Sequence, residues 1–182
     1  MTPGISETYA PSDDTMLLIR ALSGEGGGNC LEIGFGSGAV LRSLAPKFEL
    51  AVGTDVTTVA QALVARGSAD LCLADRASCF RDSSFDLVAF NPPYLPSENT
   101  PDRAVDGGPT GVEVAIAFLD DALRVLKPGG RVVALLSDRG DLARFASHCE
   151  ALGLELRESE RERLFYESLV VYEIRRTRPP GA

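Results

Sequence analysis

The feature that most constrains this chain is a regular alternation of short apolar runs with amphipathic ones. Strands are expected at 29–33, 49–54, 69–73, 85–90 and 131–136, and helices at 15–22, 39–44, 57–66, 112–126 and 141–152. This alternation is typical of a parallel sheet covered by helices. Two final runs, 154–160 and 168–175, have no helix between them and predict an antiparallel hairpin. The pattern therefore predicts an α/β fold: a Rossmann-like sheet of seven strands, mostly parallel, with a C-terminal antiparallel hairpin and helices on both faces.

The length and composition indicate one globular domain over residues 1–182. That length suffices for one hydrophobic core, and the chain is 45% hydrophobic and 24% charged. No apolar run is long enough to span a bilayer, and the first residues lack the basic and apolar stretches of a signal peptide. The cysteines Cys30, Cys72, Cys79 and Cys149 have no spacing typical of a metal site. We therefore expect a cytoplasmic protein with reduced thiols, no bound metal and no membrane segment.

The charge balance bears on possible partners. The formal net charge is −8, and the chain has no basic run. Proteins that bind nucleic acids gain affinity by neutralising phosphates with Lys and Arg. An acidic chain has to overcome repulsion to hold DNA or RNA, so the charge argues against direct nucleic-acid binding unless a partner supplies the basic surface.

A glycine-rich loop lies where the first strand meets a helix. The segment runs Glu32-Ile33-Gly34-Phe35-Gly36-Ser37-Gly38. Glycines at such a junction allow a tight turn and let the backbone approach a ligand closely. With Ala39 the loop also fits the G-x-G-x-x-A pattern of nicotinamide and flavin proteins, and a plain turn is a further interpretation.

Three acidic residues favour S-adenosylmethionine as the ligand of this loop. Glu32 can engage the cationic amino group of that cofactor, Asp55 ends the second strand and can accept both ribose hydroxyls, and Asp75 can accept from the adenine amino group. Each acid alone is more often a solvated surface charge. Three at the carboxyl ends of successive strands predict a cofactor site, because ligands bind at those ends in open α/β sheets.

The tetrapeptide Asn91-Pro92-Pro93-Tyr94 follows the fourth strand and is the most specific signal. Residues before proline are held extended, so the loop is stiff before a substrate arrives. The side-chain oxygen of Asn91 and the carbonyl of Pro92 can each accept one N–H of a substrate NH₂ group, and Tyr94 can lie against its planar face. These contacts suit methyl transfer to an amide or ring-attached nitrogen. The alternative is a proline-rich turn with a core tyrosine.

The tetrapeptide resembles that of amino-methyltransferases, which include adenine-N6 and guanine-N2 nucleic-acid enzymes and HemK-type protein glutamine methyltransferases. Two further segments are similar to the HemK type: the opening Tyr9-Ala10-Pro11-Ser12-Asp13-Asp14-Thr15 and the glycine-rich Asp106-Gly107-Gly108-Pro109-Thr110-Gly111. The resemblance runs from about Tyr9 to Arg175 and implies the class I methyltransferase fold with S-adenosylmethionine as cofactor.

The resemblance also implies which residues form the site. Catalytic roles fall to Asn91, Pro92 and Tyr94. The residues expected to contact the cofactor are Tyr9, Thr15, Glu32, Gly34, Gly36, Gly38, Asp55, Asp75, Arg76 and Asn91.

The implied substrate is the glutamine of the Gly-Gly-Gln loop of a class-one translation release factor, methylated on N5. Nucleobase-N6 or N2 methylation, protein lysine methylation and a nicotinamide-binding oxidoreductase or regulatory module stay open as alternatives. The short form resembles the archaeal and eukaryotic branch, whose members work with a small zinc-binding activator. The third strand is expected at a sheet edge, so we predict that the activator docks there, between Asp70 and Leu73, to form a heterodimer. The alternative is an edge covered by the chain's own N-terminal segment.

Overall fold

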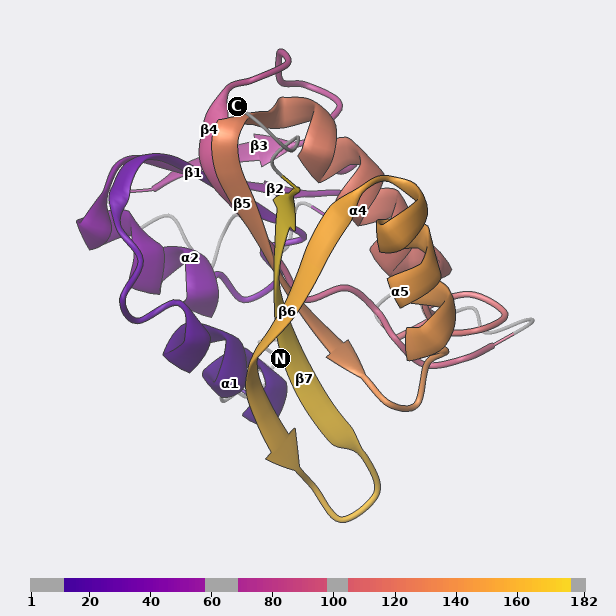
Figure 1. Ribbon diagram of the computed structural model, residues 1–182. Helices are drawn as coiled ribbons and strands as arrows, with labels where there is room; N and C mark the ends of the chain where they lie inside the picture. The colour runs from indigo at the N-terminus through magenta and orange to yellow at the C-terminus, as the bar shows by residue number, and fades with distance from the viewer. Residues whose placement is uncertain (1–11, 58–68, 98–104, 178–182) are drawn as a thin grey trace, which may run out of the picture.

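A seven-stranded sheet forms the centre of the part of the chain that the structure describes. The structure is a computed structural model that describes residues 12–57, 69–97 and 105–177 (Figure 1). The strands are β1 (Gly27–Ile33), β2 (Phe48–Asp55), β3 (Asp70–Leu73), β4 (Phe85–Phe90), β5 (Leu126–Ser137), β6 (Leu154–Arg163) and β7 (Ser168–Arg176). Their spatial order is β3-β2-β1-β4-β5-β7-β6. The first five are parallel, whereas β7 runs antiparallel to both β5 and β6. The predicted fold class, including the C-terminal hairpin, is confirmed.

Helices cover both faces of this sheet. The described helices are α1 (Asp13–Ala21), α2 (Ala39–Leu44), α4 (Glu113–Val125) and α5 (Leu142–Ala151), with a short 3₁₀ turn η1 (Ala45–Lys47). Figure 1 shows α1 and α2 on one face and α4 and α5 on the other. The helix predicted at 57–66 falls almost wholly outside the described residues. None of the described helices is long and apolar enough to cross a membrane.

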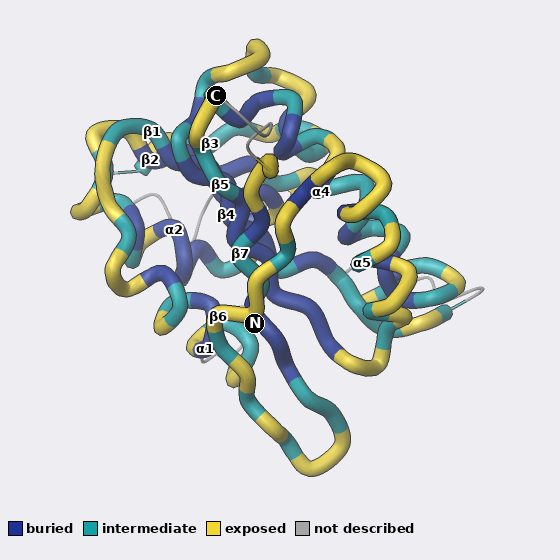
Figure 2. The backbone as a smooth tube through the Cα atoms, viewed as in Figure 1, coloured by how far each residue is buried: buried dark blue, intermediate teal, exposed yellow. Residues whose placement is uncertain are grey.

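The central strand β4 joins the cores on the two faces. Successive side chains of a strand point to opposite faces. Leu87 and Ala89 accordingly pack with the residues of α1 and α2, whereas Val88 and Phe90 pack with α4 and α5. All four are buried, and Figure 2 shows the same burial running through the middle of the sheet. A strand buried on both faces reads as a continuous apolar run, which is why the sequence indicated its central position.

Several element boundaries differ from the sequence prediction; β1 begins at Gly27 rather than Asn29, and β6 ends at Arg163 rather than at residue 160. Helix α1 begins at Asp13 rather than Thr15, with Ser12 at the N-cap position. Strand β5 begins at Leu126 rather than Arg131, so the segment Lys127-Pro128-Gly129-Gly130, which lies between the predicted helix and the predicted strand, belongs to the strand. Leu126 pairs with Phe85 and Arg131 pairs with Leu87, so five residues along β5 correspond to two residues along β4. The intervening residues bulge out of the ladder, which accommodates a proline that cannot donate a hydrogen bond.

The strand order places a ligand site between β1 and β4. The chain progresses outward from β1 through β2 to β3 on one side, and from β4 onward on the other. In open α/β sheets ligands bind at this switch point, outside the carboxyl ends of the strands. The glycine loop follows β1 and the tetrapeptide follows β4, so the fold brings the two strongest sequence signals to the same edge of the sheet.

Candidate active site

Two cavities meet at the carboxyl ends of the central strands. The larger has a volume of about 660 Å³ and lies over the ends of β1 and β2. The smaller has a volume of about 400 Å³ and lies between the tetrapeptide, the start of α1 and the β6–β7 hairpin. Four residues line both cavities: Ser12, Asp14, Asn91 and Pro93. Asn91 and Asp14 therefore stand at the boundary between the two spaces.

The glycine loop bends tightly around the floor of the larger cavity. Gly34, Gly36 and Gly38 have φ values of 72°, 46° and 70°, a region that favours glycine. The backbone N–H groups of Gly34 and Phe35 both donate to the carbonyl of Thr54, at 2.7 and 3.1 Å, and tie the loop to β2. Gly34 and Gly36 line the cavity, whereas Gly38 does not. Gly38 is the N-cap of α2, so its role is to turn the chain into the helix.

Glu32 is a buried carboxyl in the wall of the larger cavity. Its side chain is only 3% exposed, and its Oε2 atom has no hydrogen-bond partner among the described residues. Burial raises the pKa of this carboxyl well above its usual range; the Leu41 backbone and the charge of Arg42 lower it, and Asp55 raises it. A buried carboxyl without a partner is costly unless a ligand supplies one. Glu32 therefore fits a cationic donor in this cavity.

Two further acids line the same cavity. Asp55, at the end of β2, accepts hydrogen bonds from the backbone N–H of Gly36 at 2.9 Å and from the N–H and hydroxyl of Thr57 at 2.9 and 2.8 Å. These bonds fix the orientation of its carboxylate. Asp75 is more exposed and pairs with Arg76, which also contacts Asp121. Arg76 has a positive φ of 51°, so the chain turns sharply here and holds both residues in the cavity wall.

Asn91 is oriented by Asp14, a residue that the sequence analysis did not assign to the site. The side-chain Nδ2 of Asn91 donates to Asp14 Oδ2 at 2.9 Å. The other oxygen of Asp14 accepts from the Thr15 backbone at 2.6 Å and from the hydroxyl of Ser12. An ionised carboxylate only accepts hydrogen bonds, so it selects the NH₂ side of the amide. The Oδ1 atom of Asn91 has no partner among the described groups and is the acceptor left for a substrate.

The glycine-rich segment after the tetrapeptide packs directly on its backbone. Leu95 donates to the carbonyl of Val105 at 3.0 Å, and Gly107 donates back to Leu95 at 2.9 Å. A Cβ at Gly107 would lie 2.9 Å from the Pro93 carbonyl, and one at Gly111 would lie 2.6 Å from the Tyr94 carbonyl. Only glycine allows this approach. The segment therefore braces the tetrapeptide, which explains why the two occur together.

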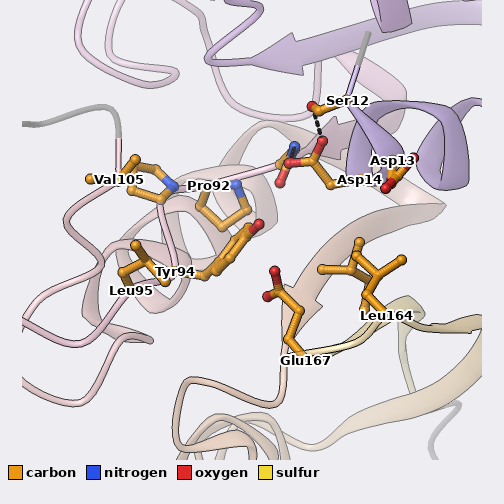
Figure 3. A pocket seen from close by; sticks show the side chains of 12 residues that line it. Ser12, Asp13, Asp14, Pro92, Tyr94, Leu95, Val105, Leu164 and Glu167 are labelled. Carbon is orange, nitrogen blue, oxygen red and sulfur yellow. Dashed lines mark hydrogen bonds between the residues drawn. The ribbon is translucent and has the colours of Figure 1, made fainter.

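The smaller cavity has walls from several elements. Figure 3 shows Tyr94 and Glu167 projecting into it, with Leu164 beside Glu167 and Asp14 across from them. The Glu167 carboxylate accepts from the hydroxyl of Ser137 at 2.5 Å, which joins the hairpin to the end of β5. Pro92 is buried, and Tyr94 is half-buried against the core beneath α1 and α2. The cavity is thus bounded by a planar aromatic ring, apolar side chains and carboxylates.

Most of the predicted site residues come together in these two cavities. The larger is lined by Thr15, Glu32, Gly34, Gly36, Asp55, Asp75, Arg76 and Asn91, and the smaller by Asn91, Pro92 and Tyr94. Tyr9 lies outside the described residues. Prediction missed Asp14, Phe118 and Glu167. Phe118 in α4 packs edge-on against Phe90 and reaches the larger cavity, but an apolar helix position does not differ in sequence from a core position.

The histidine, two of the cysteines and a charged run lie away from the two cavities. His148 is in α5, and its Nε2 lies 2.8 Å from Asp120 Oδ1 of α4, so it links two helices. The sulfurs of Cys72 and Cys79 lie 3.3 Å apart, but within the described ranges no cluster of three metal-ligating side chains occurs. The charged run 157–163 belongs to the edge strand β6 and is mostly exposed.

The charge of the larger cavity fits one of the candidate cofactors. Glu32, Asp55 and Asp75 surround it, and Glu32 is buried with one carboxyl oxygen, Oε2, that has no partner among the described residues. S-adenosylmethionine brings an amino cation, a sulfonium and two ribose hydroxyls, which these acids complement. A dinucleotide cofactor would bring a pyrophosphate anion toward a buried carboxyl. The sheet of dinucleotide-binding proteins is also all-parallel and has no strand equivalent to the antiparallel β7. The sheet order and this cavity define a class I S-adenosylmethionine-dependent methyltransferase.

Comparisons with known proteins show to which family of methyltransferases the chain belongs. No family model matches the chain. The Methanocaldococcus jannaschii protein MJ0928, provisionally named a protein N5-glutamine methyltransferase, is 30% identical over 178 residues, which cover 91% of this chain and 90% of the relative. The chain belongs to the HemK-type protein N5-glutamine methyltransferase family.

Two other relatives are similar to this chain over different shares of their lengths. A release factor glutamine methyltransferase of Caulobacter vibrioides is 35% identical over 121 residues, but the match spans only 42% of that protein's length. Among solved structures, the E. cuniculi Mtq2–Trm112 complex, responsible for methylation of the eRF1 translation termination factor, superposes with a TM-score of 0.80 at 26% identity. That match covers 93% of this chain and 98% of the other.

Proposed function

We propose that this chain methylates the side-chain amide nitrogen, N5, of the glutamine in the Gly-Gly-Gln loop of a translation release factor. The observation that carries the proposal is the Asn91 amide, which Asp14 holds with its oxygen unpartnered among the described groups. This oxygen lies where the cofactor cavity meets the smaller cavity, at the position required of a group that orients an acceptor nitrogen. The names of the relatives support glutamine as the side chain and a release factor as the protein.

The chemistry asks the protein mainly to orient a poor nucleophile. The cofactor supplies an electrophilic methyl group on a sulfonium. An amide nitrogen attacks weakly because its lone pair is delocalised. It would form a bond to the methyl carbon as the carbon–sulfur bond breaks to leave a neutral thioether, and it would release one proton to solvent. Asn91 Oδ1 and the Pro92 carbonyl each accept one N–H, which orients the lone pair and offsets the growing positive charge. Tyr94 lies in the same cavity wall, where its ring can cover the planar face of the amide.

The substrate can be tested by parallel labelling. Radiolabelled methyl transfer is measured with a release factor from the same source, with the same factor carrying Gln→Ala in the Gly-Gly-Gln loop, and with total RNA. The proposal expects label only on the unchanged factor, with mass spectrometry placing one methyl on the glutamine side chain. Label on the changed factor would point to lysine or another residue. Label confined to RNA would favour a nucleobase methyltransferase.

The proposed partner is a small activator protein that docks on β3. This strand is the sheet edge beyond β2, and no described strand pairs with its outer side. It has four residues, with Asp70 as its only charge and no lysine or proline, and ends in Leu73, which is 52% exposed. Edges are commonly blunted by charge or proline, so an apolar edge suits strand addition by a partner. The Mtq2 structure, solved as a complex with Trm112, supports a partner of this kind. Translation termination would place the pair in the cytoplasm.

The docking edge can be tested by co-expression with the activator from the same source. Wild-type enzyme is expected to co-elute with it in size-exclusion chromatography. Leu73→Lys, which adds a charge at the edge, is expected to lose the complex. Leu152→Lys is the matched control, because Leu152 is also exposed but lies at the end of α5. A wild-type enzyme that is soluble and active alone and does not bind the activator would contradict this proposal without affecting the substrate proposal.

A further inference from the structure

The β6–β7 hairpin carries an exposed aromatic pair at its tip. Phe165 is 90% exposed and Tyr166 is 80% exposed. Their ring centroids are 4.6 Å apart with an interplanar angle of 83°, an edge-to-face arrangement. Figure 1 shows the hairpin projecting beyond α1, and Figure 2 shows its tip as exposed. Two adjacent large rings that stay exposed to solvent contribute no free energy of burial to folding. Their exposure therefore indicates a surface for binding another molecule.

The hairpin is braced, so the pair is presented in a defined place. Leu164 donates to the carbonyl of Glu167 at 2.8 Å and closes the turn. The Ser168 backbone donates to Asp138 at 2.8 Å, and Ser137 donates to Glu167. These bonds fix the base of the tip to the end of β5. Arg20 of α1 adds ion pairs to Glu160 and Glu162 of β6, at 3.5 and 3.0 Å. A pre-organised aromatic surface binds with a smaller loss of entropy than a mobile one.

The tip is continuous with the smaller cavity. Leu164 and Glu167, the residues on either side of the aromatic pair, both line that cavity, whereas Phe165 and Tyr166 line neither cavity. A ligand that places an amide against Asn91 and extends out past Leu164 would meet the two rings next. The cavity wall also carries the carboxylates of Asp13, Asp14 and Glu167. The surface therefore suits a polypeptide with apolar and basic side chains beside the acceptor.

We propose that Phe165 and Tyr166 form the docking surface for the segment of the release factor that flanks its acceptor glutamine. This inference rests on the proposed function. Aromatic residues at the centre of a small interface carry much of its binding energy. The pair would hold the substrate protein while Asn91 orients the amide, so the hairpin would control affinity for the protein and leave the chemical step unchanged.

The test compares Phe165→Ala/Tyr166→Ala with Leu152→Ala, a control that removes an exposed apolar side chain at the end of α5. Binding of full-length release factor to enzyme saturated with S-adenosylhomocysteine is measured by calorimetry, and methyl transfer is followed over a range of factor concentrations. The double variant is expected to raise the Kd and KM for the factor at least about tenfold. Its kcat and its affinity for the cofactor are expected to stay within about twofold of wild type, as are all values for Leu152→Ala.

The outcomes separate this inference from the function on which it rests. If wild-type enzyme labels the release factor and the double variant binds and labels it equally well, the docking surface is wrong and the proposed function stands. If the double variant loses kcat at unchanged KM, the hairpin acts on chemistry and the inference is likewise wrong. If wild-type enzyme neither binds nor labels the factor, the proposed function fails, and the inference fails with it.

Discussion

The cofactor cavity and the smaller acceptor cavity are built in different ways. The three acids of the cofactor cavity lie on three short segments that end neighbouring strands, namely the end of β1, the end of β2 and the turn after β3, and the start of α1, Asn91 and α4 also contribute to its lining. The acceptor cavity combines the start of α1, the tetrapeptide after β4 and the hairpin near the C-terminus. The three acids are thus placed by the strand order alone, whereas the acceptor cavity requires distant parts of the chain to meet. Substitutions at the three acids should therefore change cofactor affinity, and substitutions that disturb the acceptor oxygen of Asn91, at the boundary between the cavities, should change turnover.

The largest expected effect is on turnover. Asn91→Ala should lower kcat by about a hundredfold or more, because it removes the acceptor that orients the substrate nitrogen, a loss comparable to that of an oxyanion-hole donor. Cofactor affinity, measured by calorimetry, should change little. An Asn91→Ala enzyme with normal turnover would show that the tetrapeptide is only a structural turn and would remove the distinction between the cavities.

The next effect concerns the cofactor cavity. Asp55→Ala should raise the Kd for S-adenosylmethionine roughly 10- to 100-fold, since hydrogen bonds to a charged acceptor contribute about 1.5–3 kcal/mol. The change also removes the bonds that Asp55 accepts from Gly36 and Thr57. Asp75→Ala is the comparison variant and should have a smaller effect, because the Asp75 side chain is 67% exposed and well solvated. An unchanged Kd for Asp55→Ala in calorimetric titration would contradict the assignment.

The boundary between the cavities can be tested at Asp14. Asp14→Asn keeps the shape but introduces an NH₂ group that can face the amide of Asn91 and turn its oxygen away from the substrate. We expect kcat to fall about tenfold with the KM for the protein substrate nearly unchanged. Asp14→Glu, which keeps the carboxylate, should recover part of the activity. Asp13→Asn is the matched control, since it makes the same chemical change one residue away, whereas the carboxylate that accepts from Asn91 belongs to Asp14. Equal losses in the Asp13 and Asp14 variants would rule out an orienting role.

The smallest expected effect is on stability and its dependence on pH. Burial raises the pKa of Glu32 in the folded protein, so the folded state binds a proton that the unfolded state releases. Its contribution favours folding at low pH and is lost as the pH rises from about 4.5 through the raised pKa. Glu32→Gln should therefore stabilise the cofactor-free protein at neutral pH, by about 1 kcal/mol, measured by chemical denaturation.

Glu32→Gln should weaken cofactor binding even though it stabilises the cofactor-free protein. A cationic amino group favours the ionised form of Glu32, so the affinity of the wild-type protein should rise with pH across the raised pKa. Glu32→Gln should bind more weakly at neutral pH and lose this dependence. Calorimetry at several pH values measures the Kd for the cofactor in both proteins. A wild-type affinity that falls with rising pH would mean that Glu32 does not face the cation.

The sequence by itself determined the sheet and the cofactor loop. Strand β4 is apolar except for Asp86, which marks a strand buried on both faces, and the glycines after β1 mark a turn that other residues fit poorly. These signals are local, because strand period and backbone freedom belong to a few neighbouring residues. The same holds for the tetrapeptide, whose prolines restrict their own segment. The proline-containing start of β5 was missed because its bulge depends on pairing with β4.

The tertiary structure alone decided how the acceptor cavity is made. Asp14 belongs to the opening segment that is similar to the HemK type and Glu167 is an ordinary acidic residue in the sequence, but only the fold brings one to Asn91 and the other beside Tyr94. Likewise Gly38 matches the loop pattern but serves as the N-cap of α2, away from the cavity wall. Such roles depend on contacts between residues far apart in the chain, and these are set by the packing of α1 and the hairpin against the sheet rather than by any local pattern.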